Sequence, residues 1–131
     1  MKMKKIEIDG GRFNNLKEFY DEVERCLTDG LDWEIGQNLD ALDDVLEGGF
    51  GIHDYKEEIE LTWLNSERSK LKLGFAETVK YIQMKLGNCH PTNRQEVRED
   101  LELAKNEKGE TLFEMIVEII KAHEHIKLKM Q

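Results

Sequence analysis

Apolar and polar residues alternate along three stretches of the chain, and this period of two is typical of strands with one buried face. The stretches comprise residues 4–9, 58–64 and 126–130. Between them, apolar residues recur at the three- and four-residue spacing of amphipathic helices. These predicted helices span residues 16–27, 39–47, 66–86, 96–104 and 112–120. Strands separated by helices need crossover connections, so we predict a single α/β domain with a small three-stranded parallel sheet packed with helices.

Local signals define the ends of some of these helices. Asn14 or Asn15 is a suitable N-cap for the first helix, and Thr111 is one for the last. Gly74 interrupts the long helical pattern and is able to split it in two. Trp63 continues the alternation of its strand, and we expect it in the core.

The segment 38–47 has the most unusual distribution of charge in the chain. If the segment is a helix, its apolar residues fall on one face. Four carboxylates, spaced at positions i, i+3, i+4 and i+7, then fall on the other face. These carboxylates are Asp40, Asp43, Asp44 and Glu47, and Asn38 precedes them as the N-cap. Like charges one turn apart cost a helix about 0.2–0.5 kcal/mol each, and no Lys or Arg lies between Arg25 and Lys56. A cationic partner from outside the chain is the simplest explanation of such a helix.

The overall charge favours basic proteins as partners. The chain of 131 residues has 28 acidic residues against 19 Lys and Arg, which gives a formal net charge of −9 at pH 7. Nucleic acids and anionic membrane surfaces are bound through Lys and Arg, so both are disfavoured. Basic proteins are attracted over a long range instead, and this attraction accelerates their association.

The sequence also predicts a cellular location. Residues 1–9 lack the apolar core of a signal peptide, and no stretch approaches the roughly 20 apolar residues of a membrane span. Cys26 and Cys89 form no metal or redox spacing, and a chain that is not exported keeps such thiols reduced. We therefore expect a cytoplasmic protein with partly buried, inert cysteines.

Metal binding and catalysis fit the residues less well than partner binding. His123 and His125 do not share one helical face, and the helix dipole explains a histidine near a helix C-terminus. The aspartates of 38–47 lie in a helix and lack the glycine of a calcium loop. A carboxylate pair can carry out hydrolysis, but no phosphate-binding glycine loop, nucleophile elbow or pair of catalytic histidines accompanies it. We expect no enzyme activity, no cofactor and no metal, and a small acidic hydrolase or cation-dependent enzyme is only the third hypothesis.

The acidic segment and its flanks form a motif that is found in a known family. The motif reads Gly36-Gln37-Asn38-Leu39-Asp40-Ala41-Leu42-x-Asp44-x-Leu46-x-Gly48. It resembles the signature of barstar, the intracellular inhibitor of the secreted ribonuclease barnase, and the order of the predicted elements agrees with that family. The resemblance covers residues 4–64 and 107–130. The longer middle of the chain, about 65–106, looks like a helical insertion before the last helix and strand.

The resemblance implies inhibition by occupation of the nuclease active site. The acidic helix and the loop before it enter the basic, phosphate-binding site, where a carboxylate substitutes for the phosphate of the substrate. By position, Asp44 is the central carboxylate that meets the arginines of the nuclease, Asp40 is a second charge, and Glu118 is a peripheral binding residue. A carboxylate is the planar, bidentate match of a guanidinium group.

The sequence departs from the family pattern at three interface positions. An aromatic residue of the family corresponds to Asp43, the first residue of its Tyr-Tyr-Gly loop corresponds to Glu34, and a small hydroxyl residue corresponds to Glu47. Trp33 is either a replacement for this aromatic surface or a core residue. Because aromatic residues are typical binding anchors, these changes favour a target that is more basic than barnase.

Two functions follow from these observations. The first is a cytoplasmic ribonuclease inhibitor, monomeric when free. Its predicted partner-binding residues are Asp40, Asp43, Asp44, Glu47, Glu34, Asn38, Trp33 and Glu118. The alternative is an adaptor or regulatory module that keeps the fold and binds another basic protein, which the long insertion and the lost aromatic residues favour.

Overall fold

A three-stranded parallel sheet organises the structure, which is a computed structural model that describes residues 4–27, 38–47 and 58–131. The strands are β1 (Lys4–Asp9), β2 (Ile59–Leu64) and β3 (Ile126–Met130). They lie in the order β1-β2-β3, and both neighbouring pairs are parallel. Parallel neighbours need a crossover between them, and helices supply it here, as the sequence predicts.

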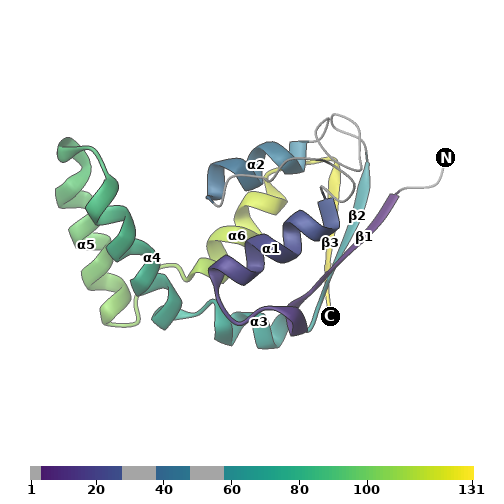
Figure 1. Ribbon diagram of the computed structural model, residues 1–131, viewed down its shortest axis with the longest axis horizontal. Helices are drawn as coiled ribbons and strands as arrows, with labels where there is room; N and C mark the ends of the chain where they lie inside the picture. Colours follow the sequence, from purple (N-terminus) through teal and green to yellow (C-terminus); the bar gives the residue numbers. More distant parts are fainter. Residues whose placement is uncertain (1–3, 28–37, 48–57) are drawn as a thin grey trace.

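The part of the chain that the structure describes also contains six α-helices. They are α1 (Leu16–Leu27), α2 (Leu39–Glu47), α3 (Ser66–Lys72), α4 (Phe75–Asn88), α5 (Arg94–Lys105) and α6 (Leu112–Lys121), with short 3-10 turns η1 (Gly10–Arg12) and η2 (Pro91–Asn93). Figure 1 shows α1, α2 and α6 together beside the sheet, and α4 and α5 as a hairpin that extends away from it. None of the described helices is long and apolar enough to cross a membrane. The predicted α/β fold, a small three-stranded parallel sheet packed with helices, is confirmed.

The main core lies between the sheet and the helices beside it, and Trp63 of β2 is fully buried in it, as predicted. The Trp63 ring contacts Phe19 and Phe113, with ring centroids 5.7 and 5.1 Å apart. Such aromatic pairs stabilise a core beyond the area that they bury. The indole N–H of Trp63 donates a hydrogen bond to Ser69 Oγ at 2.9 Å. Because Ser69 belongs to α3, this bond attaches α3 to the main core.

The hairpin of α4 and α5 has a small apolar cluster of its own. Its buried members are Ile82, Val97, Leu101 and Ala104. Leu73, directly after α3, is buried in the main core instead. The separately packed unit therefore begins at α4, whereas the insertion expected from the sequence begins at residue 65.

Hydrogen bonds to two helix N-termini anchor the hairpin to the rest of the molecule. The backbone N–H of Leu16 donates to Glu77 Oε2 at 2.7 Å, and that of Leu112 donates to Thr78 Oγ1 at 2.8 Å. Both acceptors belong to α4, and both donors are first residues of their helices. Such N–H groups have no partner within their own helix, so α4 satisfies them and is held in place in return.

The helix ends predicted from the sequence agree with the structure. Asn15 Oδ1 accepts the backbone N–H of Glu18 at 2.8 Å, and Thr111 forms a capping box at the start of α6. Gly74 separates α3 from α4. Leu71 differs from its prediction, because it belongs to the apolar pattern but its side chain is 82% exposed.

Candidate protein-binding site

Helix α2 contains the acidic segment, and its local structure agrees with the sequence pattern. Leu42, Val45 and Leu46 are buried in the main core. Asn38 Oδ1 accepts the backbone N–H of Ala41 at 2.7 Å, so Asn38 is the N-cap that the sequence predicts. With its apolar face packed inward, α2 presents its carboxylates on the remaining sides.

Asp40 and Asp44 lie one turn apart on the exposed side of α2. Neither side chain has an ion pair with another residue in the described ranges 4–27, 38–47 and 58–131. Their mutual repulsion is therefore not relieved by this part of the chain. These two carboxylates are accessible to a cationic group from outside.

The second row of carboxylates, Asp43 and Glu47, faces the side chain of His123. This side chain is only 4% exposed. Its Nε2 lies 2.7 Å from Asp43 Oδ1, and its Nδ1 lies 2.6 Å from Glu47 Oε1. The second contact has the distance of an ion pair, although its direction is not that of a hydrogen bond. Each ring nitrogen of His123 therefore contacts one carboxylate of α2.

The fold supplies a partner for two carboxylates of α2 that the neighbouring sequence lacks. The sequence shows that no Lys or Arg near the acidic helix in the chain relieves its charge, and in the fold a distant residue contacts Asp43 and Glu47. This residue is His123, which follows α6 and lies far from α2 in sequence. The helix dipole had seemed sufficient to explain this histidine. The signal that could have revealed it is a histidine placed directly after an amphipathic helix that packs against the acidic one.

His125 supports the end of the same helix. Its Nε2 lies 2.8 Å from the backbone oxygen of Leu46. A carbonyl oxygen only accepts, so Nε2–H of His125 is the donor. This bond adds a side-chain donor to a backbone carbonyl in the last turn of α2. His123 and His125 together fix the position of α2 beside the end of α6.

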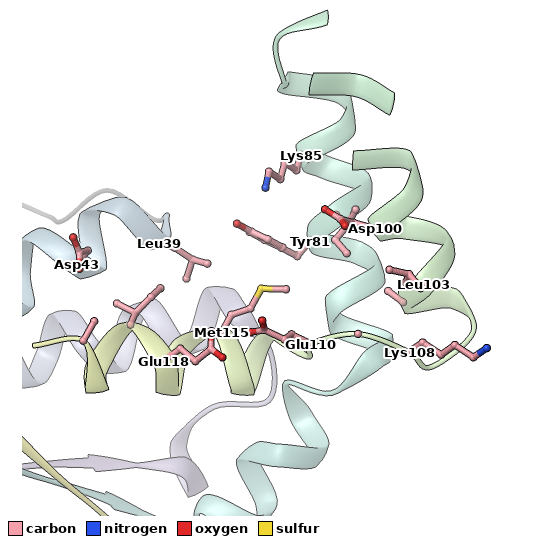
Figure 2. Close-up of a pocket in the computed structure, with 15 residues that line it drawn as sticks. Leu39, Asp43, Tyr81, Lys85, Asp100, Leu103, Lys108, Glu110, Met115 and Glu118 are labelled. Atoms are coloured by element: carbon pink, nitrogen blue, oxygen red, sulfur yellow. The ribbon is translucent and has the colours of Figure 1, made fainter. Parts of the chain in front are cut away.

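A cleft of about 600 Å³ separates α2 and α6 from the α4–α5 hairpin (Figure 2). Its lining includes Leu39 and Asp43 of α2, Tyr81 of α4, and Met115 and Glu118 of α6. The predicted binding residue Glu118 is exposed on α6 and lies in this cleft. The structure thus brings Glu118 to the same cleft as Asp43 of the acidic helix.

Glu110 is a second carboxyl group beside Glu118. Burial of the Glu110 carboxyl is the main cause that raises its pKa, and its hydrogen bond with Glu118 and the negative charges of Glu118 and Glu114 raise it further. Two carboxyl groups that approach each other favour the protonated form in this way. The sequence analysis missed Glu110, because it lies in a polar loop without any periodic pattern.

A comparison with protein families establishes the relationship of this chain. Residues 3–86 match the family model described as Barstar (barnase inhibitor). The chain belongs to the barstar family. The match includes the acidic helix and continues through α3 and most of α4. Comparisons with curated proteins and with solved structures each found no match.

The residues assigned through the barstar signature can now be located. Asp40 and Asp44 lie on the exposed side of α2, and Glu118 lies in the neighbouring cleft. Trp33 and Glu34 lie outside the described residues, so their predicted contribution stays a prediction. The candidate residues that the structure describes thus include an exposed carboxylate pair, a pair in contact with His123, and carboxyl groups of the cleft.

The cysteines of this barstar family member are partly buried, as expected, and both are free thiols. Burial, together with the charge of Glu22, raises the pKa of the Cys26 thiol to about 11. The Cys26 thiol is therefore protonated at neutral pH, which makes it a poor nucleophile. Within residues 4–27, 38–47 and 58–131, no group of three or more His, Cys, Asp or Glu side chains is arranged to hold a metal ion.

Proposed function

We propose that this protein is a non-catalytic inhibitor of a basic ribonuclease and that it acts by placing α2 in the nuclease active site. The observation that best supports this function is the exposed pair Asp40 and Asp44, for which the described residues supply no cation. A ribonuclease holds its substrate phosphate with cationic groups, and a carboxylate can pair with a guanidinium through two parallel hydrogen bonds. The family is described as a barnase inhibitor, which is a target of this class.

The acidic residues have different roles in this proposal. Asp44 is the central carboxylate that pairs with the arginines of the nuclease, and Asp40 supplies a second charge beside it. Glu118 lies at the edge of the contact, across the cleft from α2. Asp43 and Glu47 keep side-chain exposures of 54% and 33%, so they add negative potential while His123 holds them in place.

Three further residues complete the binding surface. Asn38 caps α2 and thereby fixes the direction in which its first turn projects. Trp33 and Glu34 belong to the segment before α2, and we assign them to the rim of the same contact, with Trp33 supplying aromatic surface.

The inhibitor acts in the cytoplasm, as a monomer, where it protects the cell from a nuclease that the cell itself or a neighbour makes. Its net charge of −9 attracts a basic protein over a long range. This attraction accelerates the capture of a nuclease before substrate RNA reaches the active site.

The α4–α5 hairpin favours a second candidate function, that of an adaptor. The hairpin has its own apolar cluster and extends away from the sheet, so it offers a surface that a minimal inhibitor does not need (Figure 1). In this alternative, α2 binds a basic protein other than a nuclease.

A capture experiment with three baits distinguishes these functions. The baits are the wild-type protein, an Asp40→Ala/Asp44→Ala double variant, and a control double variant, Glu96→Ala/Glu99→Ala. The control removes the same charge from an exposed part of α5. Captured proteins are identified by mass spectrometry, and ribonuclease activity is measured before and after addition of each bait.

The inhibitor function predicts a ribonuclease that is captured and silenced by the wild-type and control baits but not by the Asp40/Asp44 variant. Capture of a basic protein without nuclease activity, with the same dependence on Asp40 and Asp44, would establish the adaptor instead. Equal capture by all three baits would show that the exposed face of α2 is only a solvated surface.

A further inference from the structure

A groove between α1 and α4 is separate from the carboxylates of α2, and no described residue of α2 lines it. Its volume of about 380 Å³ lies within the range of pockets that hold small molecules. Leu16 and Glu77 both line it, and the hydrogen bond between them attaches α4 to the start of α1 (Figure 1). The lining of this α1–α4 groove also includes Lys17 and Tyr20 of α1, and Lys80, Tyr81 and Met84 of α4.

Tyr20 brings a hydroxyl group without a hydrogen bond to this groove. The residue is only 3% exposed, and its hydroxyl is buried without a hydrogen-bond partner among the residues that the structure describes. Burial raises the pKa of the Tyr20 phenol, and the nearby Tyr81 raises it further, so the hydroxyl stays protonated at neutral pH. A neutral phenol both donates and accepts hydrogen bonds. Because buried polar groups are nearly always paired, the Tyr20 hydroxyl indicates a hydrogen-bonding position for a ligand.

Two lysines give the groove a positive charge in a chain whose net charge is −9. The side chains of Lys17 and Lys80 are 73% and 77% exposed, and their ammonium groups lie 3.6 and 4.0 Å from Asp21 and Glu77. Exposed ion pairs of this kind contribute little. Glu77 also accepts the N–H of Leu16 at 2.7 Å. Both lysines are therefore available to an anionic group of a ligand.

The remaining walls of the groove suit an aromatic ring. Tyr81 is partly buried, and the side chain of Met84 is 59% exposed. A methionine thioether is flexible and packs favourably against aromatic rings. The groove extends over residues 77–84 of α4, about 10 Å of helix, whereas a stable protein interface needs roughly 800 Å² on each partner. A groove this short fits a small molecule better than a protein.

We propose that the α1–α4 groove binds a small aromatic carboxylic acid that carries a second polar group. Its ring packs on Tyr81 and Met84, its carboxylate pairs with Lys17 and Lys80, and its polar group forms a hydrogen bond with the Tyr20 hydroxyl. The site uses none of the carboxylates assigned to the nuclease, so it is independent of the proposed inhibitor function.

Nuclear magnetic resonance of methionine methyl groups tests this site in the full chain. The protein, labelled with ¹³C at its five methionine methyl groups, is titrated with p-hydroxyphenylacetate, with phenylacetate, which lacks the hydroxyl, and with tyramine, which has an ammonium in place of the carboxylate. We expect a saturable shift of the Met84 signal with p-hydroxyphenylacetate, about fivefold weaker binding of phenylacetate, and no saturable shift with tyramine. The signals of Met115, in the cleft beside α2, and of Met130, in β3, should not move.

Variants assign the contacts of the probe. Tyr20→Phe should weaken p-hydroxyphenylacetate binding about fivefold, the loss of one neutral hydrogen bond, and should leave phenylacetate binding unchanged. Lys17→Gln/Lys80→Gln should weaken the binding of both acids about fivefold. The control Lys105→Gln/Lys127→Gln removes the same charge from exposed positions elsewhere and should bind like the wild type. Without any probe, Tyr20→Phe should unfold at the same temperature as the wild type or higher, because it removes a buried hydroxyl without a hydrogen bond.

Three results would overturn the inference. A lower unfolding temperature of Tyr20→Phe without probe would show that the hydroxyl already has a partner. Equal binding of the two acids by the wild type would show that the hydroxyl does not recognise the ligand. A shift of the Met115 signal without one of Met84 would place the binding in the cleft beside α2.

Discussion

His123 Nε2 lies 2.7 Å from Asp43 Oδ1, although the two residues are 80 positions apart in the sequence. This contact, with the approach of Glu47 to the other ring nitrogen, attaches the acidic helix to the end of α6. It divides the carboxylates of α2 into two rows with different environments. One row, Asp43 and Glu47, stabilises the position of the helix, and the other, Asp40 and Asp44, is free to meet a cation.

Replacement of His123 should destabilise the protein. The variant His123→Gln leaves Asp43 and Glu47 without the imidazole that contacts both of them, and we expect a loss of about 1–3 kcal/mol in the free energy of unfolding. Urea unfolding measures this loss. The control is Glu124→Gln, since Glu124 is exposed beside His123 in the sequence and its replacement should change stability little. Equal stability of His123→Gln and the wild type would show that the contact does not hold α2 in place.

The two rows of carboxylates should respond differently to the same substitution. Asp43→Asn removes the charge that pairs with buried His123 and should lower stability by about 1–2 kcal/mol. Asp44→Asn removes only repulsion from Asp40 and should leave stability unchanged or raise it by about 0.2–0.5 kcal/mol. Thermal unfolding of both variants checks this order. Equal destabilisation by the two substitutions would contradict the division of α2 into two rows.

The sequence pattern predicted the fold well because the fold depends on local periodicity. The three alternating stretches became β1, β2 and β3, and the break at Gly74 separated α3 from α4 as predicted. Asn38 became the N-cap of α2 because its side chain acts on a neighbour three residues away. Periodicity, glycine breaks and N-caps act over a few residues, so they can be recognised in a single sequence.

The candidate site was predictable only in part. The charge of Asp40 and Asp44 is visible in the sequence. The partner of Asp43 is His123, which lies 80 positions further along the chain, after β2 and the hairpin. The proximity of Glu110 and Glu118 likewise depends on how a loop meets a helix. Contacts of this kind are set by tertiary packing, which periodicity does not encode.

Gly10 should be required by the close packing of η1 against α3. A Cβ atom at this position would lie 2.3 Å from Ser69 Oγ and 2.7 Å from the backbone oxygen of Asn65. Gly10→Ala therefore forces a shift of the Ser69 hydroxyl that binds Trp63, and we expect a loss of about 1–3 kcal/mol. Gly87→Ala is the matched control, because no atom lies within 4 Å of its added Cβ. In helix α4 this control should be neutral or stabilising by up to about 1 kcal/mol. A stable Gly10→Ala variant would contradict the tight packing.

Glu22 should make stability depend on acid pH. Burial, the largest single influence, opposes ionisation of Glu22, but hydrogen bonds from Arg25 and the Asp9 N–H, with the charges of Arg25 and Arg12, together lower its pKa below the ordinary 4.5. A lowered folded-state pKa stabilises the protein above the ordinary pKa, and the effect is lost as pH falls through the lowered value. Unfolding measured between neutral pH and the acid range should therefore show a pH-dependent loss that is smaller in Glu22→Gln. The same pH dependence in both proteins would contradict this assignment.

Inhibition of the captured ribonuclease by single variants is the most direct test of the central claim that Asp44 is the binding carboxylate. Residual ribonuclease activity is measured against the concentration of the wild type, Asp44→Ala, Asp43→Asn and the control Glu96→Gln. Truncating one member of a buried interfacial charge pair weakens binding by about 2–5 kcal/mol, a range that draws on the barnase–barstar complex itself. We therefore expect Asp44→Ala to need at least about a tenfold higher concentration for half inhibition, with Glu96→Gln close to the wild type and Asp43→Asn between the two. Equal inhibition by Asp44→Ala and the wild type would contradict the account.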